Sequence, residues 1–70
     1  MMIYKQRIRE LRKERHLTQE EIGSLLNTSM QYYNKYENTD IPLPITHLIT
    51  LAKFYGVSTD YILGLKDTKE

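Results

Sequence analysis

The sequence predicts an all-α fold in which five short helices pack into one compact domain, residues 1–65, followed by a polar tail, residues 66–70. Three observations lead to this prediction. Seventy residues leave room for one domain only. Apolar residues recur at three- and four-residue spacing, the period of one helix face, in successive segments of the chain. Residue types that start and stop helices separate these segments.

The first predicted helix covers residues 3–15. Tyr4, Ile8 and Leu11 recur along it at three- and four-residue spacing and would share one face. We place its end at His16, because histidine tolerates the left-handed backbone conformation better than most residues other than glycine. The helix should therefore offer one apolar face to the core.

A second helix is predicted to begin at Thr18. Thr18 and Glu21 have the T-x-x-E spacing of a capping box, in which hydroxyl and carboxylate each satisfy a backbone N–H that the helix leaves unpaired. The helix should end near Asn27, before a polar turn of about three residues. Its inward-facing residues are predicted to be Ile22, Leu25 and Leu26.

Ser29 is a good N-cap for a third helix, which we expect at about residues 30–37. Tyr33 and Tyr36 share one face of this helix and should pack in the core with their hydroxyls at its rim. The opposite face is rich in polar residues and would point outward.

Residues 38–44 contain two prolines and several turn-forming residues, which indicates a loop. Pro44 suits the first turn of a fourth helix, and Gly56 can end that helix in the left-handed conformation. Ser58 opens a short fifth helix, which ends at Gly64, and residues 65–70 are predicted to be frayed. The apolar repeat of the fourth helix consists of Ile45, Leu48, Leu51, Ala52 and Tyr55.

The net charge of +1 hides an uneven distribution along the chain. Residues 1–15 carry six basic and two acidic side chains, a balance of +4, whereas residues 16–70 carry four lysines and seven acidic residues, a balance of −3. This asymmetry can give one basic face beside a neutral one. An ordinary amphipathic helix with solvated charges explains it equally well, so charge alone does not decide whether the partner is a nucleic acid.

The composition argues against several classes of protein. The chain has no cysteine and only two isolated histidines, so we expect no metal and no cofactor. No apolar run approaches the ~20 residues of a membrane span, and the first residues lack the apolar stretch of a signal peptide, which predicts a cytoplasmic protein without a membrane partner. No nucleophile with a base, glycine-rich phosphate loop or catalytic acidic pair is evident, so neither an enzyme nor a small-molecule ligand is expected.

Two short helices joined by a short turn, with polar side chains displayed by the second helix, form the arrangement that inserts a helix into the major groove of DNA. The residues carry a more specific pattern: T-Q-E-E-I-G at 18–23, L-L-N-T-S at 25–29 and Q-Y-Y-N-K-Y-E-N at 31–38. This pattern resembles the phage lambda repressor and Cro family of helix-turn-helix domains. The resemblance extends over residues 48–64, close to the family's closing helices, and so spans nearly the whole chain.

The resemblance implies a lambda-repressor-like fold and a sequence-specific regulator of transcription, most simply a repressor that occupies a promoter. It also implies that Arg12 pairs with Glu37 and ties the first helix to the third. Gly23 stands where the family usually has alanine; because glycine inside a helix costs roughly 1 kcal/mol relative to alanine, we expect the third helix to approach closely there. Asn27 stands where the family usually has glycine and should adopt the left-handed conformation.

The outward face of the third helix carries the candidate base-reading residues. Gln31 can make a bidentate contact with adenine, and Lys35 can reach guanine or phosphate. Met30 and Tyr32 can contact thymine methyl groups. The resemblance points to the same positions and implies that Gln19, at the start of the second helix, bonds phosphate. The predicted DNA-binding residues are Gln19, Ser29, Met30, Gln31, Tyr32, Asn34 and Lys35.

The loop after the third helix departs from the family. Where the family often has Gly-Lys, this chain has Thr39, Asp40 and Ile41, which removes phosphate-binding cations and adds an anion. Arg7 and Arg9 on the first helix, or contacts with a partner, would then have to compensate for the lost phosphate contacts.

A domain that reads one half-site with one short helix usually binds as a twofold dimer, so we expect a homodimer on double-stranded DNA. The candidates for the dimer contact are residues left over from the predicted core: Ile49, Phe54, Thr59, Tyr61 and Leu65. Two alternatives stay open: a protein-interaction module that keeps the scaffold without binding DNA, which the acidic loop permits, and the antitoxin half of a toxin–antitoxin pair.

Overall fold

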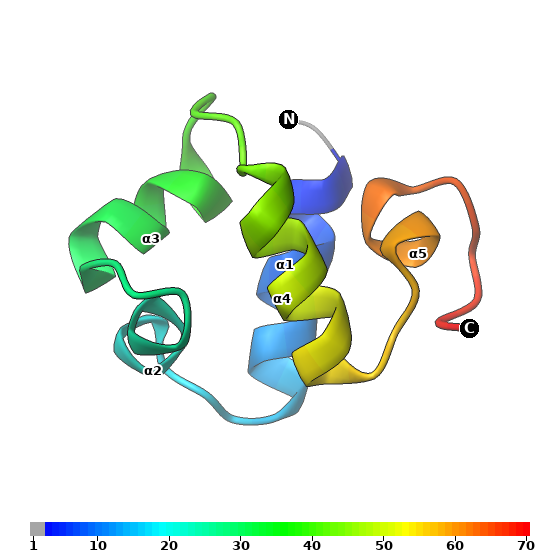
Figure 1. The fold of residues 1–70 in the computed structure, drawn as a ribbon, viewed down its shortest axis with the longest axis horizontal. Helices are drawn as coiled ribbons and strands as arrows, with labels where there is room; N and C mark the ends of the chain where they lie inside the picture. Colours follow the sequence, from blue (N-terminus) through cyan, green and yellow to red (C-terminus); the bar gives the residue numbers. More distant parts are fainter. Residues whose placement is uncertain (1–2) are drawn as a thin grey trace.

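The computed structural model describes residues 3–70, which form five α-helices: α1 (Ile3–Glu14), α2 (Gln19–Leu25), α3 (Met30–Asn38), α4 (Ile45–Tyr55) and α5 (Thr59–Leu63). Helices α1 and α4 occupy the middle of the molecule, with α2 and α3 at one end and α5 at the other (Figure 1). The expected all-α fold of five helices is confirmed. None of the helices in this part of the chain is long and apolar enough to cross a membrane.

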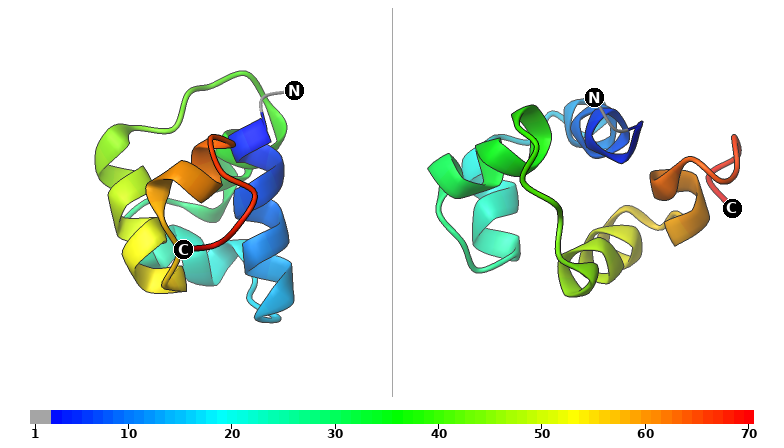
Figure 2. Two further views of the ribbon diagram at one scale, coloured as in Figure 1. Left: turned by 90° about the vertical axis from the view of Figure 1, so that its right-hand side faces the viewer. Right: turned by 90° about the horizontal axis from the view of Figure 1, so that it is seen from above.

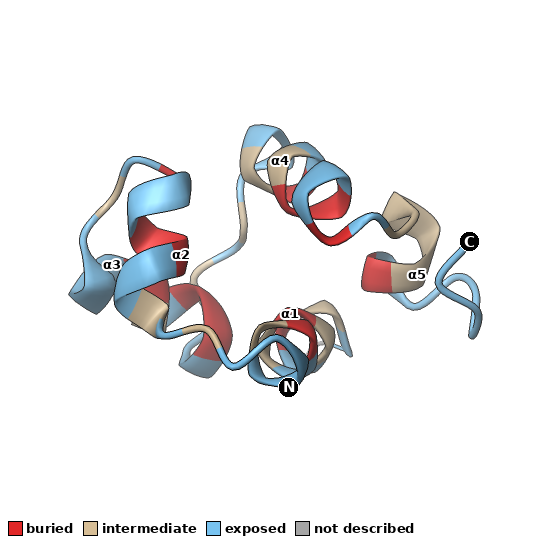
Figure 3. Ribbon diagram, turned by 90° about the horizontal axis from the view of Figure 1, so that it is seen from below, coloured by how far each residue is buried: buried red, intermediate tan, exposed pale blue. Residues whose placement is uncertain are grey.

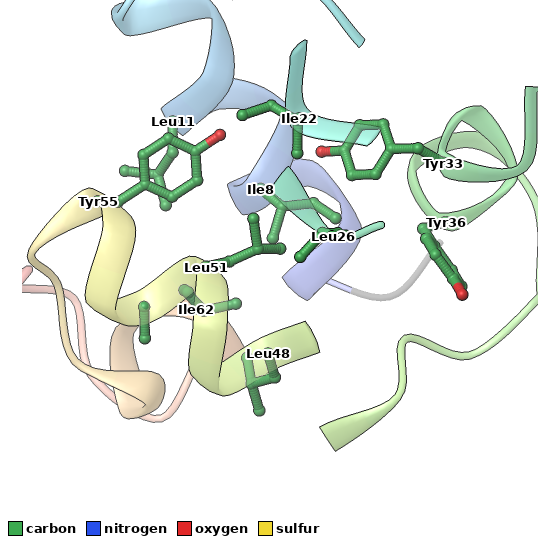
Figure 4. Close-up of a cluster of buried hydrophobic side chains, with 11 residues drawn as sticks. Ile8, Leu11, Ile22, Leu26, Tyr33, Tyr36, Leu48, Leu51, Tyr55 and Ile62 are labelled. Carbon is green, nitrogen blue, oxygen red and sulfur yellow. The ribbon is translucent and has the colours of Figure 1, made fainter. Parts of the chain in front are cut away.

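The apolar faces of all five helices meet in one core. Figure 3 shows the buried segments turned toward the space that the helices enclose, and Figure 4 shows the side chains that fill it. Burying one large aliphatic or aromatic side chain stabilises the fold by about 1.5–3 kcal/mol. The core residues are Ile8, Leu11, Ile22, Leu26, Tyr33, Tyr36, Leu48, Leu51, Ala52, Tyr55 and Ile62.

Two residues that the periodicity placed in the core lie outside it. Leu25 is 38% exposed and Ile45 is 70% exposed, so both predictions are wrong. Leu25 is the last residue of α2 and Ile45 is the first residue of α4. Periodicity identifies the correct face of a helix, but a residue at a helix end is buried only where a neighbouring element extends far enough to cover it.

The predicted helix ends form as local chemistry requires. Thr18 Oγ1 accepts the backbone N–H of Glu21 at 3.1 Å, and Glu21 Oε1 accepts the backbone N–H of Thr18 at 2.9 Å, which completes the capping box. Ser29 and Ser58 cap α3 and α5 by accepting the N–H three residues further on, each at 3.0 Å. Beyond the end of α1, His16 adopts the expected left-handed conformation with φ of 57°.

The C-terminal tail differs from its prediction, because residues 65–70 fold back toward α1 instead of fraying (Figure 2). The backbone N–H of Ser58 donates to the carbonyl of Lys69 at 2.8 Å. Arg7 donates to the carbonyl of Lys66 at 2.7 Å, and Lys69 Nζ lies 2.8 Å from Glu14 Oε1. Two of these three bonds end on backbone carbonyls, which any residue type carries, so the polar composition of the tail did not indicate them.

Candidate nucleic-acid interface

The turn between α2 and α3 is tight enough to fix the angle between the two helices. A Cβ atom at Gly23 would lie 3.1 Å from the carbonyl oxygen of Thr28 and 3.2 Å from that of Ser29, so glycine allows the close approach expected at this position. The N–H of Thr28 donates back to the carbonyl of Gly23 at 2.8 Å. Asn27 adopts the left-handed conformation with φ of 62°, which asparagine tolerates better than most residues.

A buried ion pair joins α1 to α3, as the resemblance implied. Arg12 Nε lies 2.8 Å from Glu37 Oε2, and Arg12 Nη2 lies 3.1 Å from Glu37 Oε1. The Glu37 side chain is fully buried, the Arg12 side chain is 11% exposed, and Arg12 Nη1 also donates to the carbonyl of Leu17 at 3.0 Å. The hydrogen bond to Glu37 raises the pKa of Arg12, so the guanidinium stays charged. This bidentate geometry is the strong form of an arginine–carboxylate contact.

The outward face of α3 presents the predicted base-reading residues to solvent. Met30 and Tyr32 are 43% and 42% exposed, and Gln31 and Lys35 are exposed as well. The Tyr32 ring is held edge-on by Tyr36 at 5.3 Å between centroids, and Lys35 Nζ lies 5.6 Å from its centre. Within residues 3–70 the side chains of Gln31 and Lys35 form no hydrogen bond or ion pair, so their donors are free to meet a ligand.

Three other predicted contact residues differ, because at least one side-chain polar atom of each already has a partner: Gln19, Asn34 and Ser29. Gln19 Nε2 donates to Glu37 Oε1 at 3.2 Å, and Asn34 Nδ2 donates to Gln19 Oε1 at 3.0 Å. The Ser29 hydroxyl accepts the backbone N–H of Tyr32 in the first turn of α3. Their contacts with DNA stay predictions. A shallow hollow connects this group to the outward face, and its lining consists of Gln19, Met30, Gln31, Asn34, Lys35 and Thr39.

Lys5 is a buried residue that the sequence analysis missed. It is 1% exposed and its Nζ donates to the carbonyl of Tyr36, at 2.8 Å, and to the carbonyl of Ile41. These contacts hold the end of α3 and the loop that follows it, and a cation near the end of a helix interacts favourably with the helix dipole. The spacing held a signal, since Lys5, Ile8 and Arg12 fall at i, i+3 and i+7 and therefore share the face that meets α3.

Most basic residues of α1, together with Arg15 just beyond its end, brace the fold, which corrects the expectation of a phosphate-binding face. Besides Lys5 and Arg12, Arg15 donates to the carbonyls of Phe54 and Tyr55 at the end of α4, at 3.2 and 2.7 Å. Arg9 is half-buried and donates to Asn38 Oδ1, at the end of α3, at 3.3 Å. The predicted role of Arg9 therefore remains open.

Among the basic residues of α1, Arg7 departs most clearly from its predicted role in phosphate binding. Its Nη1 donates to the carbonyl of Tyr61 at 2.6 Å and to that of Lys66, and its guanidinium stacks 4.2 Å from the centre of the Tyr61 ring. The Arg7 side chain is 13% exposed. Because α5 and the tail pack against this face of α1, Arg7 cannot also neutralise a phosphate, and its predicted compensating role is wrong.

The candidate dimer residues divide by exposure. Ile49, Phe54 and Leu65 are 43%, 39% and 72% exposed and remain available for a partner. Thr59 and Tyr61 are half-buried, and the Tyr61 ring is covered in part by Arg7. The dimer contact itself stays a prediction.

The fold, the tight turn and the exposed face of α3 together define a helix-turn-helix domain, the class of protein that binds DNA through the second helix of the motif. The chain belongs to the helix-turn-helix family, whose model matches residues 8–62. It is 42% identical over 65 residues to an uncharacterized HTH-type transcriptional regulator, YobD, of Bacillus subtilis (strain 168). It is 33% and 30% identical over 63 residues to the HTH-type transcriptional regulators PrpR and RamB of Mycobacterium tuberculosis.

These relatives are longer than the present chain. The match to YobD covers 93% of this chain and 58% of that protein, and the matches to PrpR and RamB cover 90% of this chain and 13% of each of those proteins. The family match confirms the expected class, a helix-turn-helix domain, and the relatives are named as regulators of transcription. The repressor role, the dimer and the individual site residues remain predictions.

Proposed function

We propose that this chain binds a specific sequence of double-stranded DNA in the cytoplasm by inserting α3 into the major groove, and that it represses transcription by occupying a promoter. The observation that carries the proposal is the outward face of α3, where Gln31 and Lys35 keep their hydrogen-bond donors free while Met30 and Tyr32 expose apolar surface beside them. Glutamine and lysine are side chains that read adenine and guanine in the major groove, and apolar groups recognise the thymine methyl.

The ion pair of Arg12 and Glu37 supports the proposal because it fixes α3 against α1. A recognition helix discriminates bases only if its side chains are held at a constant position relative to the phosphate contacts that set the register. Lys5 holds the same C-terminal turn of α3 through the carbonyl of Tyr36. The interface is thus built on a rigid element rather than on a mobile loop.

A homodimer fits the dimensions of the molecule. The longest Cα extent is 29 Å, and half-sites on one face of DNA lie about 34–36 Å apart. With side chains added, two copies whose α3 helices enter successive major grooves would lie side by side. The exposed Ile49, Phe54 and Leu65 are the candidates for contact between them. No small-molecule ligand is part of the proposal.

The test is selection of bound duplexes from a random library by the purified protein at about 50 and 200 mM salt. The proposal predicts enrichment of a palindrome, with weaker binding at the higher salt concentration. A variant with Gln31→Ala and Lys35→Ala should lose the sequence preference. Failure of the unaltered protein to enrich any sequence would contradict the proposal and favour an interaction module with a protein partner.

A further inference from the structure

A chain of hydrogen bonds runs from the buried ion pair to the surface hollow on α3. Glu37 Oε1 accepts from Gln19 Nε2 at 3.2 Å, and Gln19 Oε1 accepts from Asn34 Nδ2 at 3.0 Å. Arg12 holds the carboxylate of Glu37 through two further bonds. Gln19 and Asn34 are half-buried, and both line the hollow that opens beside Met30, Gln31 and Lys35.

The polarity of this chain is fixed at its buried end. A carboxylate oxygen can only accept a hydrogen bond, so Gln19 must turn its NH₂ group toward Glu37. The carbonyl oxygen of Gln19 then faces Asn34, which must in turn direct its NH₂ group toward Gln19. Rotating either amide by half a turn would place two donors or two acceptors face to face. The orientation of the Asn34 amide is therefore dictated by Glu37, two residues away along the chain of bonds.

The fixed orientation leaves the oxygen of the Asn34 amide at the surface end of this chain of hydrogen bonds. Asn34 Oδ1 accepts no hydrogen bond from any residue between 3 and 70, and it belongs to a side chain that lines the hollow. In the major groove, adenine and cytosine present an exocyclic NH₂ donor, whereas guanine and thymine present carbonyl acceptors at the equivalent place. An oriented acceptor therefore distinguishes the two classes of base.

We propose that Asn34 determines specificity by accepting a hydrogen bond from the amino group of an adenine or cytosine, and that Gln19 is a positioning residue that holds the Asn34 amide in this orientation. The proposal rests on the DNA-binding function proposed above and assigns the class of base read at one position of each half-site. It also gives Gln19 a role in base discrimination in addition to the phosphate contact predicted for it.

The experiment measures binding of each variant to the selected duplex and to all of its single-base substitutions. Unaltered protein should prefer adenine or cytosine over guanine or thymine at one position of each half-site by about fivefold or more. Asn34→Ala should abolish the preference at that position alone. Gln19→Met, which keeps the length of the side chain but removes both polar atoms, should relax the same position to about twofold or less while the other positions keep their preferences.

Two controls separate this effect from general damage. Lys69→Ala alters the C-terminal tail, which lies at the end of the molecule opposite α2 and α3, and should leave the whole profile unchanged (Figure 1). Thermal unfolding of each variant checks that the compared proteins are folded at the assay temperature. Uniform weakening of all duplexes by Gln19→Met, with every base preference retained, would overturn the proposal by showing that Gln19 contacts only phosphate. If the unaltered protein selects no sequence at all, the proposed function itself fails and the assignment of Asn34 fails with it.

Discussion

Removing the positive charge of the buried ion pair should cost a large part of the stability of this domain. Replacing Arg12 by methionine leaves the Glu37 carboxylate, whose side chain is fully buried, with Gln19 as its remaining side-chain donor. Stranding one member of a buried pair typically costs about 3–5 kcal/mol. A domain of this size has a free energy of unfolding of about 4–10 kcal/mol, so Arg12→Met removes from about a third to all of it.

The assay is urea unfolding followed by circular dichroism, with the slope of the transition compared between proteins so that midpoints report stability. A double-mutant cycle adds Glu37→Met and the combination of both substitutions. The double variant should be less destabilised than the sum of the two single variants, because no charge is left stranded. Lys69→Met is the matched control: it removes a lysine from an ion pair whose two side chains are 50% and 53% exposed, and it should leave the midpoint almost unchanged.

The reasoning would be refuted if Arg12→Met shifted stability by less than about 1 kcal/mol, the value typical of an exposed pair. Strict additivity in the cycle would refute it as well, because additivity means that Arg12 and Glu37 do not interact in the folded protein.

Three further predictions concern the core, the turn and the DNA contacts. Burial raises the pKa of Tyr55 to about 12 in the folded protein, whereas an unfolded tyrosine ionises near pH 10. This group therefore contributes its full stability below pH 10, and the domain loses that contribution as the pH rises from 10 to about 12. Tyr55→Phe should make this loss shallower in urea unfolding at pH 8 to 11.5, and an unchanged dependence of stability on pH would contradict the prediction. Gly23→Val should destabilise by about 1–3 kcal/mol, because its side chain meets the carbonyl of Thr28, and a wild-type urea midpoint would show that the turn yields. Arg9→Gln should reduce the magnitude of the slope of log DNA affinity against log salt concentration by about one unit, whereas Arg7→Gln should leave this slope unchanged in a folded protein. Equal effects of the two substitutions on the slope would contradict the assignment of Arg7 to the fold.

The helices were predictable because their determinants are local. The capping box of Thr18 and Glu21, the serine caps and the left-handed His16 and Asn27 depend on residues a few positions apart, and all of them form as predicted. Helical periodicity located the core for the same reason. Its failures, Leu25 and Ile45, occur at helix ends, where burial depends on the length of an element distant in the sequence.

The contacts that escaped prediction join residues far apart in the chain, and most end on backbone carbonyls. Lys5 reaches the carbonyls of Tyr36 and Ile41, and Arg7 reaches those of Tyr61 and Lys66. Every residue type carries a backbone carbonyl, so the sequence does not show which carbonyl will accept a hydrogen bond. From the sequence alone these arginine and lysine side chains were therefore indistinguishable from solvated surface charges. For the same reason the balance of +4 over residues 1–15 overstated the charge available to DNA.

The candidate site was predictable in outline but not in its internal connections. The polar face of α3 follows from periodicity, whereas Gln19, Asn34 and Glu37 come together only when α2 and α3 pack at the angle that the Gly23 turn permits. A sequence pattern names the residues of such a group, but only the packed structure shows which atoms already have partners.

The most direct test of the central claim, that the outward face of α3 reads bases, is to compare unaltered protein with Gln31→Ala on the selected duplex and its single-base variants. The account predicts that Gln31→Ala flattens the preference for adenine at one position in each half-site, where a bidentate contact contributes about 1–3 kcal/mol of discrimination, and leaves other positions unchanged. An identical base-preference profile for the two proteins would contradict the claim that α3 carries the readout.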